Sequence, residues 1–165
     1  MAAEEPVATA DHLEGFVVLT QSTLGQLISK PRLLPERLRK PPFRFLFDVV
    51  AEVARQTGFG AAELFGGPPG EKVAPPGARE EKVAFIQGWI ALAAATLGEQ
   101  AADLASVSPV DIVCGVRPEW TNYLLQCTAA AAWPDSLAAP PSPSQLDPSL
   151  ARAQAGVRAA EAEPP

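Results

Sequence analysis

Apart from Pro6, the 18 prolines of this chain stand at the joints between its apolar segments and in its C-terminal part. Proline has no backbone N–H and cannot continue a helix interior or a central strand, so each joint marks a boundary. Between the joints, apolar residues recur at helical spacing, and we find neither an alternating strand pattern nor an internal repeat. The sequence therefore predicts a compact all-α domain with disordered termini.

The segment at 43–57 dominates the expected core. Apolar residues cover most of its circumference, which is typical of a buried helix, so we place it at the centre of the domain. Gly58 suits the left-handed residue that ends this helix. Ser108, followed by proline and then by Asp111, is typical of a helix start. The expected helices span residues 14–29, 35–40, 43–57, 80–97 and 118–132.

We expect one domain with tails, because 165 residues suit a single hydrophobic core. Residues 1–13 are expected to form a disordered acidic leader, residues 14–133 the domain, and residues 134–165 a Pro/Ala-rich linker or tail. The segment 66–77 holds four prolines and four glycines, which predicts a loop.

One segment opposes the overall charge of the chain. From Lys30 to Arg55 there are seven Lys or Arg and three Asp or Glu, a local net charge of +4 in a chain of net charge −6. Charge concentrated in one place usually has a partner of opposite sign. The acidic remainder would repel a phosphate backbone, so the composition argues against a general nucleic-acid binder.

The remaining residues give no catalytic, metal or membrane signal. His12 is the single histidine, so no Ser-His-acid set exists, and Cys114 and Cys127 do not form a Cys-x-x-Cys pair. We expect both thiols to be buried in a reducing compartment. The N-terminus does not resemble a secretory signal, and the longest apolar stretch, 88–98, is too short to span a bilayer. These features predict a soluble cytosolic protein without enzymatic activity, cofactor or metal.

Two blocks of the sequence are more specific than the helical spacing of apolar residues. The first runs from Leu24 to Ile28 and from Leu38 to Asp48, and includes Lys-Pro-Pro-Phe-Arg-Phe-Leu. The second, 111–126, contains Ile-Val-x-Gly-x-x-Pro-Glu-x-Thr-Asn-x-Leu-Leu-Gln. Over residues 20–128, the pair resembles the N-terminal calponin-homology-like domain of the microtubule-interacting (TRAF-interacting) family of intraflagellar transport complex B subunits.

The resemblance implies a calponin-homology fold that binds tubulin or microtubules through a basic surface. It also implies a location in the cilium or flagellum, at the basal body, in the cytoplasm and on the cytoskeleton. Other complex B subunits would be partners, joined through a coiled coil outside this sequence. We expect neither nucleic-acid nor membrane partners. The residues expected to contact acidic tubulin are Lys30, Arg32, Arg37, Arg39, Lys40 and Arg44.

Other interpretations of the same residues stay open. A run of charge is most often a solvated face without a partner. The alternative function is a protein-docking adaptor within the transport complex that does not contact tubulin directly. Actin binding follows only from analogy between folds.

The polar motif of the second block predicts a structural role. Pro118 and Glu119 suit the first turn of a helix. Thr121 and Asn122 are expected to bond backbone groups of the loop at Gly115, which would brace the helix start. A ligand-binding role is the alternative.

Overall fold

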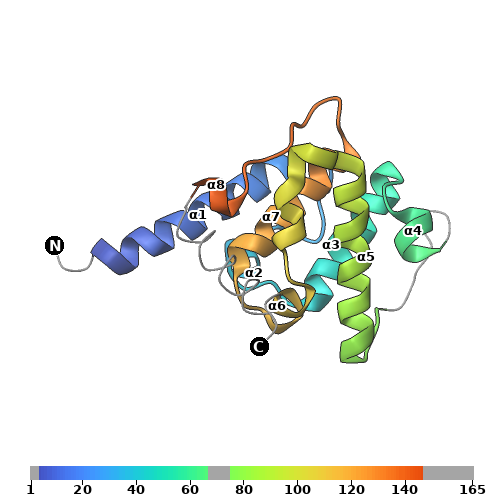
Figure 1. Ribbon diagram of the computed structural model, residues 1–165, viewed down its shortest axis with the longest axis horizontal. Helices are drawn as coiled ribbons and strands as arrows, with labels where there is room; N and C mark the ends of the chain where they lie inside the picture. The colour runs from blue at the N-terminus through green and yellow to red at the C-terminus, as the bar shows by residue number, and fades with distance from the viewer. Residues whose placement is uncertain (1–3, 67–74, 147–165) are drawn as a thin grey trace, which may run out of the picture.

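The computed structural model describes residues 4–66 and 75–146, and within these ranges it contains helices and no strand (Figure 1). The all-α prediction is confirmed. The predicted disorder of residues 1–3 and 147–165, and most of the predicted loop at 66–77, lie outside the described residues. The elements are α1 (Glu4–Leu24), α2 (Pro35–Arg39), α3 (Phe43–Thr57), α4 (Ala61–Phe65), α5 (Arg79–Leu97), the 3-10 helix η1 (Gly98–Ser106), α6 (Pro109–Cys114), α7 (Pro118–Ala132) and α8 (Pro143–Leu146).

Helix α7 lies at the centre of the domain. Every side chain from Trp120 to Ala131 is buried, and α1, α2, α3 and α5 all pack against this helix (Figure 1). The prediction that residues 43–57 form the central helix is wrong. Helix α3 buries a broad apolar face but leaves Arg44 and Arg55 exposed, so it lies on the outside of the domain.

Several buried polar side chains of α7 have partners inside the core, although Trp120 Nε1 and Gln126 Oε1 form no hydrogen bond among the described residues. Gln126 Nε2 donates to Phe16 O and to Thr20 Oγ1, both at 3.0 Å. Trp89 Nε1 of α5 donates to Thr128 Oγ1 at 2.8 Å. Burial of a polar group is costly unless it is hydrogen-bonded. These bonds explain how a helix with several polar residues can be buried on all sides.

Helix α3 is fixed by its aromatic residues and its end. The Phe43 and Phe47 rings lie 6.0 and 5.2 Å from the Phe85 ring of α5, measured between centroids. Gly58 has a φ of 83° and donates its N–H to Ala54 O at 2.7 Å, as the sequence predicts. The start of α6 is confirmed as well, because Ser108 Oγ accepts the N–H of Asp111 at 3.2 Å. The contacts of Phe43 and Phe47 with Phe85 hold the start of α3, which carries Arg44, against α5.

Described helices continue beyond both ends of the expected domain, residues 14–133. Helix α1 begins at Glu4, within the segment expected to be a leader. Pro6 does not prevent this, because the N–H groups of a first helical turn have no intrahelical acceptor. The segment after residue 133 returns to the domain: Ser144 Oγ donates to Asp103 Oδ2 at 2.7 Å, and Ser142 is buried and bonds the same carboxylate.

The two cysteines have different surroundings. Cys127 is buried in α7, and burial raises the pKa of its thiol to about 12. Cys114 is exposed at the end of α6, so the prediction of two buried thiols is wrong for this residue. The Arg79 guanidinium of α5 donates a hydrogen bond to its Sγ at 3.4 Å.

Candidate functional site

All six basic residues expected to bind tubulin are exposed, and we call them the basic edge: Lys30, Arg32, Arg37, Arg39, Lys40 and Arg44. Arg37 and Arg39 belong to α2, and Lys40 is the residue that follows it. Arg44 lies in the first turn of α3. Lys30 and Arg32 precede α2, in a segment held by the bond from Gln21 Nε2 to Leu33 O at 2.8 Å.

Helix α2 presents its cations outward because one side chain anchors it. Leu38 is completely buried, while Arg37 and Arg39 on either side of it are exposed. Pro35 occupies the first turn, where a missing N–H costs nothing. Leu34, the residue before the helix, is 37% exposed. The anchor of this short helix is therefore Leu38 together with the contacts of its backbone.

Asn122 of α7 holds the backbone of α2. Its Nδ2 donates to Leu38 O at 2.8 Å and to Pro118 O at 2.9 Å, and its Oδ1 lies 2.8 Å from the Thr20 hydroxyl of α1. The expected partner was the loop at Gly115. Asn122 instead joins α1, α2 and α7 at one buried point and so links the two sequence blocks.

The other motif residues lie around the start of α7. Pro118 is its first residue, Glu119 lies in its first turn, and Thr121 is buried. Arg117 precedes them with a left-handed φ of 53°. Its Nε lies 3.2 Å from Asp111 Oδ2 of α6, an ion pair that spans the turn between α6 and α7. This geometry supports a structural role for the motif.

Two members of the basic edge are paired with carboxylates. Arg39 forms a two-point ion pair with Glu14 of α1, with Nη2 to Oε1 at 3.1 Å. The hydrogen bond from Arg39 lowers the pKa of Glu14, and the same bond raises the pKa of Arg39. Arg44 Nε lies 3.2 Å from Asp48 Oδ1, one turn further along α3.

The other four cations of the basic edge have no ion-pair partner within residues 4–66 and 75–146, although they differ in their surroundings. Arg37 lies over the Phe45 ring, with its Cζ 6.0 Å from the centroid. Lys30 lies near Glu52 of α3. Burial raises the pKa of Glu52, but hydrogen bonds from Arg55 and Gln56 and the charges of Arg55 and Lys30 outweigh this and lower it. Arg32, Arg37 and Lys40 are thus the exposed members of the basic edge for which the described residues show no carboxylate partner.

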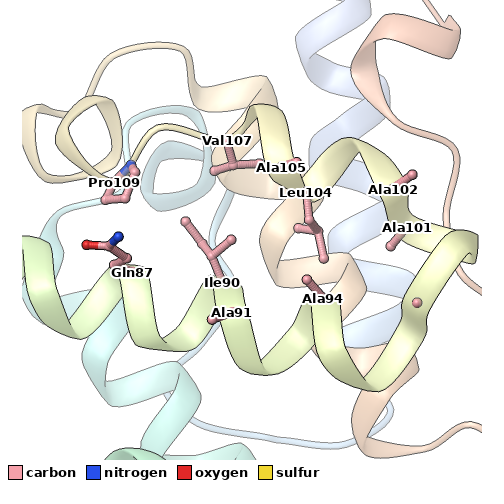
Figure 2. A pocket seen from close by; sticks show the side chains of 11 residues that line it. Gln87, Ile90, Ala91, Ala94, Ala101, Ala102, Leu104, Ala105, Val107 and Pro109 are labelled. Atoms are coloured by element: carbon pink, nitrogen blue, oxygen red, sulfur yellow. The ribbon is translucent and has the colours of Figure 1, made fainter.

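A separate feature is an apolar groove of about 350 Å³ between α5 and η1 (Figure 2). Figure 2 shows Ile90 and Ala94 of α5 pointing toward the segment that carries Leu104 and Val107. None of the lining residues is charged. The groove is therefore not part of the basic edge.

The described residues contain no group of three or more His, Cys, Asp or Glu side chains that could hold a metal ion. None of the described helices combines the length and the apolar character that a membrane span requires.

Sequence reasoning missed one cation near this surface. Lys82 of α5 lies over the Phe43 ring, with its Nζ 5.5 Å from the centroid. In the sequence, Lys82 follows Glu80 and Glu81 and stands far from the basic segment. Only the packing of α5 against α3 brings it to the first turn of α3.

Comparison with known proteins gives consistent matches. The model of the family described as "Microtubule-binding protein MIP-T3 CH-like domain" matches residues 16–133. TRAF3-interacting protein 1 of Danio rerio is 40% identical over 121 residues, which cover 70% of this chain and 18% of the relative. The protein of that name from Mus musculus is 38% identical over 112 residues, covering 65% of this chain and 16% of the relative. The aligned region is thus less than a fifth of these relatives. The chain belongs to the MIP-T3 family of calponin-homology-like domains.

Proposed function

We propose that this domain binds tubulin, as the heterodimer or in the microtubule, through the basic edge. The observation that carries the proposal concerns Arg37 of α2 and Lys40, the residue after it. Both are exposed, neither has an ion-pair partner among the described residues, and α2 is fixed to the core of a chain that is acidic elsewhere. The outer surface and the C-terminal tails of tubulin are rich in carboxylates. Membership of a family described as microtubule-binding supports the same partner.

The strength of such a contact depends on several charges acting together. An exposed ion pair contributes on the order of 0 to 1 kcal/mol, so no single member of the basic edge can provide useful affinity alone. Their sum also steers the acidic partner toward this face and raises the association rate. Both effects weaken with added salt.

The setting follows from the relatives, which are much longer than the aligned region. The domain would act as a non-enzymatic binding module of an intraflagellar transport protein. Subunits of complex B would then be its further partners, through regions outside this sequence. Its location would be the cilium or flagellum, the basal body and the cytoplasmic cytoskeleton.

Titration with tubulin heterodimer at two salt concentrations tests the proposal. Between about 0.03 M and about 0.3 M salt the Debye length falls severalfold, so the dissociation constant should rise by about tenfold or more. Binding that does not change with salt would contradict a carboxylate contact. That result would favour the alternative function, an adaptor that docks through an uncharged surface such as the groove in Figure 2.

A further inference from the structure

We infer that the tubulin-binding surface continues from the basic edge across the first turn of α3 onto α5, and that Lys82 is a contact residue. The inference rests on the proposed function and adds one residue and one helix to the same site. The evidence is the position of two phenylalanine rings and of the cations that lie over them.

Phe43 and Phe45 lie on two sides of α3, with Arg44 between them. Successive residues of a helix are about 100° apart, so Arg44 is about 100° from each phenylalanine. Both rings are buried, at 8% and 3% exposure, which places the core on the opposite side of the helix from Arg44. Arg44 therefore lies on the solvent-facing side of the first turn of α3, with one phenylalanine ring on each side of it.

Each ring carries a cation from a neighbouring helix. The Arg37 guanidinium of α2 lies over Phe45, and the Lys82 ammonium of α5 lies over Phe43. The faces of aromatic rings attract cations, so both side chains are held at the flanks of α3. Arg37, Arg44 and Lys82 thus form a row across one helical turn, from α2 over α3 to α5.

The charges on the first turn of α5 are segregated. Arg79 and Lys82 are three residues apart and share one side of the helix. Arg79 contacts α6 through Cys114, and Lys82 contacts α3 through Phe43. Glu80 and Glu81 lie on the other side of the turn. Lys82 is partly exposed and forms no ion pair among the described residues, so an acidic partner can reach its charge.

The test compares Lys82→Gln with Arg55→Gln in tubulin titrations at low salt. Both variants lose one positive charge, but Arg55 lies in the last turn of α3 and pairs with Glu52. Lys82→Gln should weaken binding by about two- to fivefold, the range that one exposed ion pair spans, and Arg55→Gln should weaken it less. Lys82→Glu should weaken binding further. Circular dichroism and thermal melting should show that each variant is folded.

Equal affinities for Lys82→Gln, Arg55→Gln and the parent chain would overturn the inference. If the parent nevertheless binds tubulin in a salt-dependent way, and charge reversal at Arg37 weakens that binding, equal affinities would exclude only Lys82 from the contact surface. The proposed function would then stand. If the parent does not bind tubulin, the proposed function fails together with this extension. If the Lys82→Glu variant is unfolded because the contact with Phe43 is lost, the affinity of the uncharged Lys82→Gln variant decides whether Lys82 contacts tubulin.

Discussion

Replacing Arg37 and Lys40 by glutamate should weaken tubulin binding by about ten- to a hundredfold at low salt, because two attractive charges become repulsive. Both residues are exposed and neither has an ion-pair partner among the described residues, so their reversal breaks no ion pair that the structure shows. Arg37 contributes a contact over Phe45, whose loss should be small at the surface. The measurement is a tubulin titration, with circular dichroism to check the helical content.

The choice of Arg37 and Lys40 depends on the structure. Sequence alone favours including Arg39, but Arg39 is paired with Glu14, and a glutamate at position 39 would face that carboxylate. Glu14→Gln is a control whose effect on tubulin affinity should be in the opposite direction. It removes the ion-pair partner of Arg39, so tubulin binding should become stronger. If the Arg37 and Lys40 double variant binds as well as the parent, the basic edge is not the contact surface.

Replacing Asn122 by leucine should lower the free energy of unfolding by about 2–4 kcal/mol. Leucine has the same number of side-chain heavy atoms and the same branching, but it cannot donate to Leu38 O or accept from the Thr20 hydroxyl. Buried polar groups of α2 and α1 would therefore lose a partner. A buried polar group without a partner has given up its hydrogen bonds to water. This loss costs more free energy than a satisfied hydrogen bond contributes to stability. Denaturant unfolding measures the effect as a lower midpoint with an unchanged slope.

Thr96→Val provides the matched control for Asn122→Leu. Thr96 also bonds a backbone carbonyl, Leu92 O at 2.8 Å, but it is exposed on α5. Water can replace that bond, so this variant should change stability by less than about 0.5 kcal/mol. Equal stabilities for the Asn122 variant and the parent would mean that the bonds between α7, α1 and α2 do not hold the domain together.

The central helix α7 shows which features of the fold cannot be predicted from the sequence. Apolar spacing locates the segments that form α3, α5 and α7, and the residues at their ends are predictable because Gly58 and Ser108 act through their own backbone. The burial of α7 is not predictable in this way, because Asn122 and Gln126 count as surface residues in a pattern of apolar positions. Their partners, Leu38, Phe16 and Thr20, lie between 84 and 110 residues away in the sequence.

The same limit applies to the binding surface. Composition identifies the basic segment, because its charge opposes that of the rest of the chain. The pairing of Arg39 with Glu14 and the position of Lys82 over Phe43 depend on how α1, α2, α3 and α5 pack. Which cations are neutralised and which are available is therefore a property of the tertiary structure.

Cross-linking with a carbodiimide, which joins amines to carboxylates without a spacer, tests the tubulin contact most directly. The chain has only four lysines, Lys30, Lys40, Lys72 and Lys82, so the cross-linked sites can be assigned by mass spectrometry. We predict that Lys40 is cross-linked to carboxylates of tubulin at low salt, and that the product decreases as salt is added. Cross-links confined to Lys72 or to the N-terminal amine, with none at Lys40, would contradict binding through the basic edge.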